Sequence, residues 1–153
     1  MELWVGVITV AGTLLGAIVA HILQNRTADR RETETNRAAA RRDLRQATAR
    51  LLSETTGLRR LQFGRWALRG ATSAERTTAK DAALEARSRV TEALVEVQLL
   101  TDDTTVRRLL DELLDSAFTL HDAADQDDMD LRADRARAAH NDLVAVVGRL
   151  VRA

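Results

Sequence analysis

Three histidines, at positions 21, 121 and 140, are the residues of this sequence best suited to acid–base or metal chemistry. On a continuous third helix, His121 and Asp125 share one face and could offer two metal ligands. One helix supplies only two ligands, and two-metal carboxylate bundles use Glu-x-x-His motifs, which this sequence lacks. We therefore predict no metal site, and interpret His121 as a solvated or capping residue near a helix C-terminus.

The sequence offers no other recognisable catalytic group. It contains no Cys, which excludes thiolate nucleophiles, disulfides and zinc-thiolate sites. No Gly-rich phosphate loop ending in Gly-Lys-Ser or Gly-Lys-Thr is present, and no Ser lies in a pattern typical of a triad. We predict that the protein is not an enzyme, has no cofactor and has no small-molecule substrate.

Arginine side chains form the one cluster with binding potential. Arg41, Arg42, Arg45 and Arg50 could contact phosphates, and Phe63 and Trp66 follow among further arginines. The competing interpretation is internal pairing: residues 24–69 hold twelve Arg against five acids, and residues 101–131 hold ten acids against two Arg. The two segments could pair within one chain or between chains. Phe63 and Trp66 then belong to a helical core or to an interface.

The elements that position these residues begin with an apolar segment, Leu3–Leu23, of 21 residues. A helix of that length spans about 30 Å, the hydrocarbon thickness of a bilayer. The acidic start and the length disfavour a cleaved signal peptide, and the rest of the chain has too little apolar surface to bury such a helix. We predict a single-pass anchor, residues 1–24, in the cytoplasmic membrane.

Flanking charges give the predicted anchor a direction. Four arginines follow it, Arg26, Arg30, Arg31 and Arg37, whereas Glu2 precedes it. The positive-inside rule then places the N-terminus outside and the body in the cytoplasm, with the arginines near the lipid headgroups. Gly12, Gly16 and Ala20 form a small-xxx-small face, which favours a homo-oligomer or docking on another membrane protein.

The remainder of the chain predicts an all-α fold, since it contains no Pro and is rich in Ala, Leu and Arg. Residues 25–43 predict a charged helical stalk, with a flexible linker as the alternative. Residues 44–153 predict an antiparallel bundle of three or four helices. Its expected core stripes are Leu44, Leu51, Leu58 and Leu61; Ala83, Ala86, Val90, Ala93, Val97 and Leu100; Val106, Leu109, Leu110, Leu113, Ala117 and Leu120; and Leu131, Ala139, Leu143, Val146, Val147 and Leu150. Thr72 and Glu75 predict a capping box.

Several stretches resemble those of short actinobacterial single-pass membrane proteins, some of which are named KilB. They are VAGTLLGAIVAHILQNRTADRRE, VEVQLLTDD and LHDAAD. The resemblance implies a membrane-associated protein tied to plasmid spread. We therefore expect a non-enzymatic, membrane-anchored helical scaffold, for which the resemblance implies an accessory role in plasmid spread. The alternatives are a membrane-tethered nucleic-acid-binding protein and a holin-like pore former.

Overall fold

The computed structural model describes residues 2–152 and, from residue 34 to residue 152, also the side chains. Within residues 2–152 the chain is helical and has no strand, which confirms the all-α prediction. The helices are α1 (Glu2–Ala67), α2 (Ser73–Leu100), α3 (Thr104–Phe118) and α4 (Gln126–Leu150), with a short 3₁₀ turn, η1 (Leu120–Asp122), after α3. The chain divides into two compact units, Met1–Ala39 and Ala40–Ala153.

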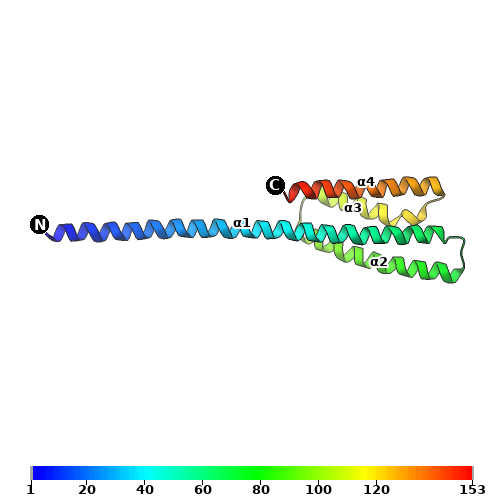
Figure 1. Ribbon diagram of the computed structural model, residues 1–153, viewed down its shortest axis with the longest axis horizontal. Coiled ribbons are helices and arrows are strands. Elements are labelled where there is room, and N and C mark those ends of the chain that lie inside the picture. The colour runs from blue at the N-terminus through cyan, green and yellow to red at the C-terminus, as the bar shows by residue number, and fades with distance from the viewer. Residues whose placement is uncertain (1, 153) are drawn as a thin grey trace. The chain divides into compact units, whose positions relative to one another are not determined.

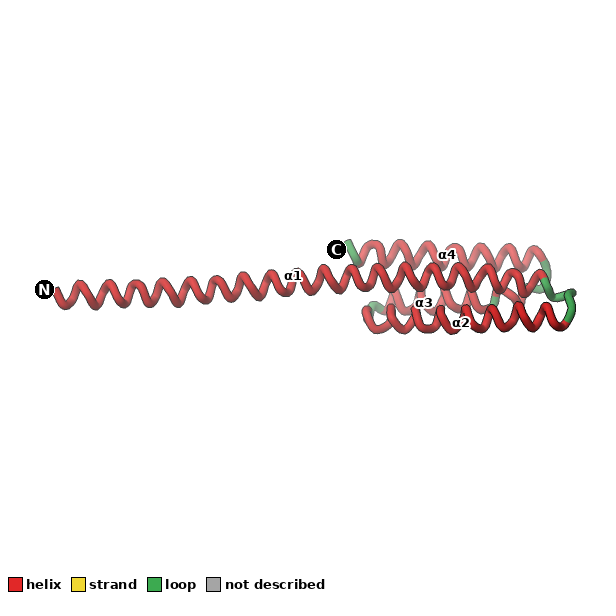
Figure 2. The backbone as a smooth tube through the Cα atoms, turned by 60° about the horizontal axis from the view of Figure 1, so that its bottom comes forward, coloured by secondary structure: helices red, strands yellow, loops and turns green. Residues whose placement is uncertain are grey.

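The second unit is a helical bundle, as the sequence predicted. The C-terminal part of α1, from Ala40, lies beside α2, α3 and α4 (Figures 1 and 2). Successive helices run in opposite directions because only short loops join them.

Side-chain caps explain where the bundle's helices begin. The Thr72 hydroxyl accepts a hydrogen bond from the Glu75 amide at 3.3 Å, and the Glu75 carboxylate accepts one from the Thr72 amide at 2.9 Å. This confirms the predicted capping box. The carboxylate of Asp103 accepts a hydrogen bond from the Val106 amide, and that of Asp125 from the Asp128 amide, both at 2.9 Å. Each cap satisfies a helix-end donor that has no partner within its own helix.

The core follows a seven-residue repeat. On α2 the buried residues are Ala83, Ala86, Val90, Ala93 and Val97, and on α3 they are Val106, Leu109, Leu110, Leu113 and Ala117. Both sets agree with the predicted stripes, except that Leu100 is exposed, so its predicted core position is wrong, and that Leu120 is buried in η1 rather than in α3. On α4 the buried residues are Met129, Ala136, Ala139, Leu143 and Val147, so the predicted core positions Leu131 and Leu150 are wrong.

Buried polar side chains alternate with leucines on α1. Leu44, Leu51 and Leu58 are buried as predicted, and Thr48, Thr55 and Gln62 are buried between them. The Thr55 hydroxyl donates to the Leu51 carbonyl at 2.7 Å, and the Gln62 side-chain amide donates to the Phe118 carbonyl at 3.2 Å. The hydroxyl of Thr48 has no hydrogen-bond partner among the described residues.

The difference between the two threonines predicts different responses to the same substitution. A buried hydroxyl without a partner costs about 1–3 kcal/mol, whereas a bonded one does not carry that cost. We expect the Thr48→Val chain to have a free energy of unfolding higher than that of the Thr55→Val chain by about 1 kcal/mol or more. Urea unfolding followed by circular dichroism measures both, and equal effects would contradict the assignment.

Within the part of the chain that the structure describes, no helix is long and apolar enough to cross a membrane. The segment Leu3–Leu23, for which the sequence predicts a membrane span, falls on residues whose side chains lie outside that description.

Candidate interaction site

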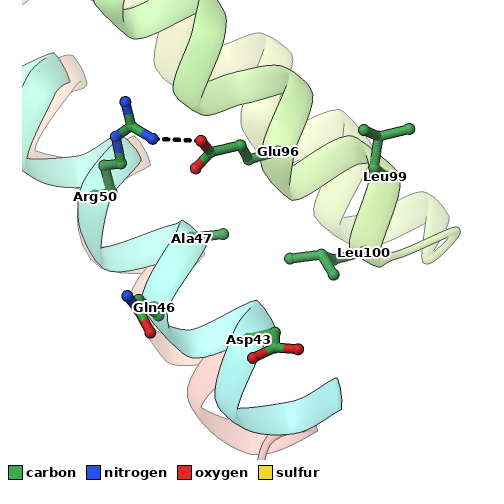
Figure 3. A pocket seen from close by; sticks show the side chains of 7 residues that line it. All are labelled: Asp43, Gln46, Ala47, Arg50, Glu96, Leu99 and Leu100. Carbon is green, nitrogen blue, oxygen red and sulfur yellow. Dashed lines mark hydrogen bonds and ion pairs between the residues drawn. The ribbon is translucent and has the colours of Figure 1, made fainter. Parts of the chain in front are cut away.

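A groove of about 540 Å³ runs between α1 and α2 at the end of the bundle where α2 ends. Its walls are Asp43, Gln46, Ala47 and Arg50 from α1 and Glu96, Leu99 and Leu100 from α2 (Figure 3). Leu100 points toward α1, whereas Leu99 points away from it and has 82% of its surface exposed. The ion pair between Arg50 and Glu96 bridges the two helices on one side of the groove.

The sequence explains why a groove lies here. Ala47 occupies an inward position of α1 where its neighbours carry leucines, and its small side chain leaves space against α2. On the other side, α2 stops at Leu100 because Thr101 is extended and Asp103 caps the next helix. Apolar side chains at the end of α2 therefore meet a small residue instead of a large one, and the groove has an apolar floor with polar rims.

A second groove, of about 490 Å³, lies between α1 and α4. Leu52, Val144 and Val147 give it an apolar wall, and Arg45 and Arg152 supply two guanidinium groups. The Arg152 guanidinium folds back over Gly148, and a Cβ at that glycine would lie 3.6 Å from its nearest nitrogen. This groove combines apolar surface with positive charge, whereas the first groove has both an acid and a base at its rim.

A basic cluster borders the same pair of helices farther along. Arg60 and His140 line a third hollow, and the Nδ1 atom of His140 is buried without a hydrogen-bond partner among the described residues. Burial, and secondarily the positive charge of Arg59, lowers the pKa of His140. Burial and the nearby Arg137 also lower the pKa of Arg59. His140 is therefore held in its neutral form.

The lowered pKa of His140 predicts an acid sensitivity of the fold. Below about pH 6.5 the unfolded chain protonates this histidine before the folded chain does, so stability falls with falling pH; above that value both states are neutral and the effect vanishes. We expect His140→Gln to flatten the decline of the melting temperature between about pH 7 and about pH 5. The measurement is thermal unfolding over that range, and an unchanged slope would contradict the assignment.

The structure separates the arginines that the sequence singled out for phosphate contact. Arg41, Arg42 and Arg45 are exposed, as is Arg37, and none of the four forms an ion pair with another described side chain. Arg50 is engaged by Glu96. Farther along α1, Arg69 donates to the carbonyl oxygens of Ala123 and Ala124, at 3.2 and 2.9 Å. Among the arginines singled out for phosphate contact, only Arg50 therefore has an acidic partner among the described side chains.

The predicted pairing of the basic helix with the acidic segment does not occur within this chain among the described side chains. The ion pairs that α1 makes go to α2, from Arg50 to Glu96 and from Glu54 to Arg89 at 3.3 Å. The acids of α3 and its flanks pair locally, as in Arg107 with Asp102 at 2.5 Å and Arg108 with Glu112. The charge imbalance between the two segments is thus left on the surface.

Two histidine predictions have different outcomes. His121 and Asp125 do not share a helix face, because α3 ends at Phe118 and Asp125 caps α4; that expectation was wrong. His121 lies in η1, where its Nδ1 contacts the Phe118 carbonyl at 3.0 Å, in agreement with a capping role. No group of three or more metal-ligating side chains gathers within the described part of the chain.

The predicted association face, Gly12, Gly16 and Ala20, lies outside the side chains that the structure describes. The same holds for three of the predicted membrane-surface arginines, Arg26, Arg30 and Arg31. These assignments stay predictions from the sequence.

A family model described as KilB plasmid transfer protein matches residues 45–151. The chain belongs to the KilB plasmid transfer protein family. No curated protein and no solved structure matches the chain. The match covers α2, α3, α4 and α1 from Arg45, so it falls on most of the bundle and on most of the residues that line its grooves.

The described part of the KilB bundle presents several grooves between its helices. The three grooves described above lie between pairs of helices and combine alkyl groups with at least one arginine, and the first also has aspartate and glutamate side chains. Such surfaces suit helical or extended segments of other proteins. The inward stripes of the sequence do not predict the grooves. The residues that could have indicated the first groove are Leu99, an apolar residue outside the α2 stripe, and Ala47, a small residue at an inward position of α1.

Proposed function

We propose that this KilB-family protein is a non-enzymatic, membrane-anchored scaffold that serves plasmid transfer by binding other proteins. The family match carries the proposal, because it falls on a helical bundle whose described surface presents apolar grooves with charged rims. The apolar segment Leu3–Leu23 supports the anchor, and the arginines that follow it support a cytoplasmic body. In this view the bundle positions partners at the inner surface of the membrane.

Fractionation of cells that express the full chain tests the anchor. We expect the protein in the membrane pellet after an alkaline wash, and a C-terminal tag protected from protease in intact cells. Leu14→Arg combined with Leu15→Arg places two charges in mid-span, at a cost of about 2.5–3.5 kcal/mol each, and should move the protein to the soluble fraction. A wild-type chain in the soluble fraction would refute the anchor.

A transfer assay tests the role itself. A plasmid without this gene should transfer at a reduced frequency, and the wild-type gene should restore it. The double arginine variant should not restore transfer, although its bundle is unaltered. Full restoration by that variant would show that transfer does not need the membrane attachment.

A second candidate is a membrane-tethered nucleic-acid-binding protein. The observation that favours it is the exposed group Arg41, Arg42 and Arg45, which has no acidic partner among the described side chains. Binding of the full chain in nanodiscs to duplex DNA should then weaken steeply with salt, and replacing the three by Gln should reduce the salt slope by roughly 2–3. Arg107→Gln is the control, since Arg107 pairs with Asp102. No binding at low salt would remove this candidate.

A further inference from the structure

The outward face of α2 is uncharged over much of its length. Opposite the buried stripe, the positions Leu84, Ser88, Thr91, Val95 and Gln98 follow one another at alternating spacings of four and three, and all are exposed. Leu99 lies beside them and is the most exposed large apolar side chain among the described residues. We call these six residues the α2 seam. Asp81 and Asp102 bound it at its two ends.

The uncharged outward face of α2 differs from the exposed face of α3, a neighbouring helix in the same bundle. On α3 every exposed position after the two threonines that begin the helix is charged: Arg107, Arg108, Asp111, Glu112 and Asp115. A solvated helix normally carries charges there, and an uncharged outer seam at heptad spacing is typical of a helix that packs against another helix on that side as well. The α2 seam therefore lacks its partner in the single chain.

The residues beside the α2 seam identify the partner. In heptad terms Ser88 and Val95 are a positions, and Leu84, Thr91 and Gln98 are d positions. The flanking g positions are Lys80, Arg87 and Leu94, and the flanking e positions are Glu85, Glu92 and Leu99. In a parallel pair of helices, each g residue approaches the e residue of the next heptad on the other helix.

A second copy of α2 matches this arrangement. In a parallel pair, Lys80 meets Glu85 of the other copy, Arg87 meets Glu92, and Leu94 meets Leu99, so base faces acid and apolar faces apolar. In an antiparallel pair, g would face g and e would face e, which brings bases onto bases and acids onto acids. The charge pattern is self-complementary in the parallel orientation alone.

Contacts within the chain leave these charges available. The Glu85 carboxylate pairs with Arg89 at 2.9 Å, and the Arg87 guanidinium lies 4.2 Å from the ring centroid of Phe118. Glu85, Arg87 and Arg89 are exposed. Contacts of exposed charged side chains contribute little to stability, so they can be exchanged for contacts across the pair. Glu92 and Lys80 are exposed and form no ion pair with a described side chain.

We propose that the α2 seam is a parallel homodimer interface between two copies of this chain. This inference deepens the proposed scaffold function and rests on its membrane anchor. The polar residues Ser88, Thr91 and Gln98 make the interface weak, so the dimer forms when a shared membrane raises the local concentration of the chain. A parallel pair also places the Ala40 ends of both bundles on the same side, as two chains attached to one bilayer require.

Disulfide trapping tests the seam, since the chain contains no Cys. Ser88→Cys and Val95→Cys, each introduced alone into the full chain, should cross-link to disulfide dimers in membranes under mild oxidation. Ser53→Cys, an exposed serine on α1, is the matched control and should cross-link far less. In an antiparallel pair an a position faces a d position. If Val95→Cys cross-links only when mixed with Thr91→Cys, the pair is antiparallel and the proposal is wrong. Cross-linking at the level of the control would overturn it as well.

A charge swap tests whether cross-linking depends on the predicted ion pairs or results from random collisions of chains in the membrane. Arg87→Glu in the Ser88→Cys chain should lower cross-linking roughly fivefold or more, because two attractive pairs become repulsive. Adding Glu92→Arg should restore it, and a failure to restore would contradict the register. Circular dichroism checks that each variant is folded.

Fractionation of the same samples distinguishes a failure of the dimer interface from a failure of the proposed membrane anchor. Wild-type amounts of chain in the membrane without cross-linking would overturn the α2 seam alone. A soluble chain would overturn the anchor, and cross-linking of that chain at raised concentration would still decide the seam.

Discussion

Replacing Leu110 with alanine should lower the free energy of unfolding by about 2–5 kcal/mol. Leu110 is 0% exposed and belongs to a core cluster that also includes Leu51 of α1, Val90 of α2 and Leu143 of α4. The substitution removes apolar surface from a core cluster to which all four helices of the bundle contribute. The surrounding helices collapse only partly around the lost atoms, so a cavity cost adds to the lost transfer energy. Thermal or urea unfolding followed by circular dichroism measures the loss.

Leu131→Ala is the matched control. Spacing along the sequence assigns both leucines to inward stripes, but Leu131 is 50% exposed on α4. We expect its replacement to change stability by no more than about 0.5 kcal/mol. Similar losses for the two variants would contradict the orientation that the structure gives to α4.

The error at Leu131 shows how the phase of a helix is determined. Steps of seven back from Leu143 lead to Ala136 and Met129, and all three are buried. Leu131 is two residues out of step with Met129, which turns its side chain to the far side of the helix. The seven-residue spacing of Met129, Ala136 and Leu143 is visible in the sequence. A prediction based on hydrophobicity nevertheless prefers Leu131 to Met129, which lies between two aspartates.

Polar core positions escaped prediction for a related reason. Thr48, Thr55 and Gln62 follow the same seven-residue repeat as Leu44, Leu51 and Leu58, so their period marks them as inward. A search for apolar residues passes over them. Their burial depends on partners distant in sequence, such as the Phe118 carbonyl that Gln62 reaches, and no local pattern reveals such a contact.

The end of α3 could not be located from local signals either. No Gly or Pro separates Phe118 from Asp125, and the apolar spacing continues through Leu120. The break depends on contacts with other segments: the Arg132 guanidinium donates to the Thr119 carbonyl at 3.0 Å, and Trp66 reaches the Ala123 carbonyl. The capping box at Thr72 is the opposite case, since its partners lie within one turn and the sequence alone predicted it.

Trp66→Ala should lower the free energy of unfolding by about 3–5 kcal/mol. The indole of Trp66 packs against the cluster of Leu120, Ala123 and Met129, where η1 joins α4. Its Nε1 donates to the Ala123 carbonyl at 2.8 Å, and the Arg69 guanidinium lies 4.5 Å from its ring centroid. The side chain thus holds the loop that no local signal specifies. Urea unfolding measures the loss.

Two further substitutions test how the Trp66 side chain stabilises the bundle. Trp66→Phe keeps most of the apolar surface and loses the hydrogen bond, so it should cost about 0.5–1.5 kcal/mol. Phe63→Ala, at a ring that is 47% exposed, should cost clearly less than Trp66→Ala. If Trp66 stacked on nucleic-acid bases instead, its loss would weaken DNA binding while the fold stayed intact. A stable Trp66→Ala chain with impaired DNA binding would therefore favour the nucleic-acid candidate over the scaffold, whereas an unstable one assigns this aromatic to the bundle.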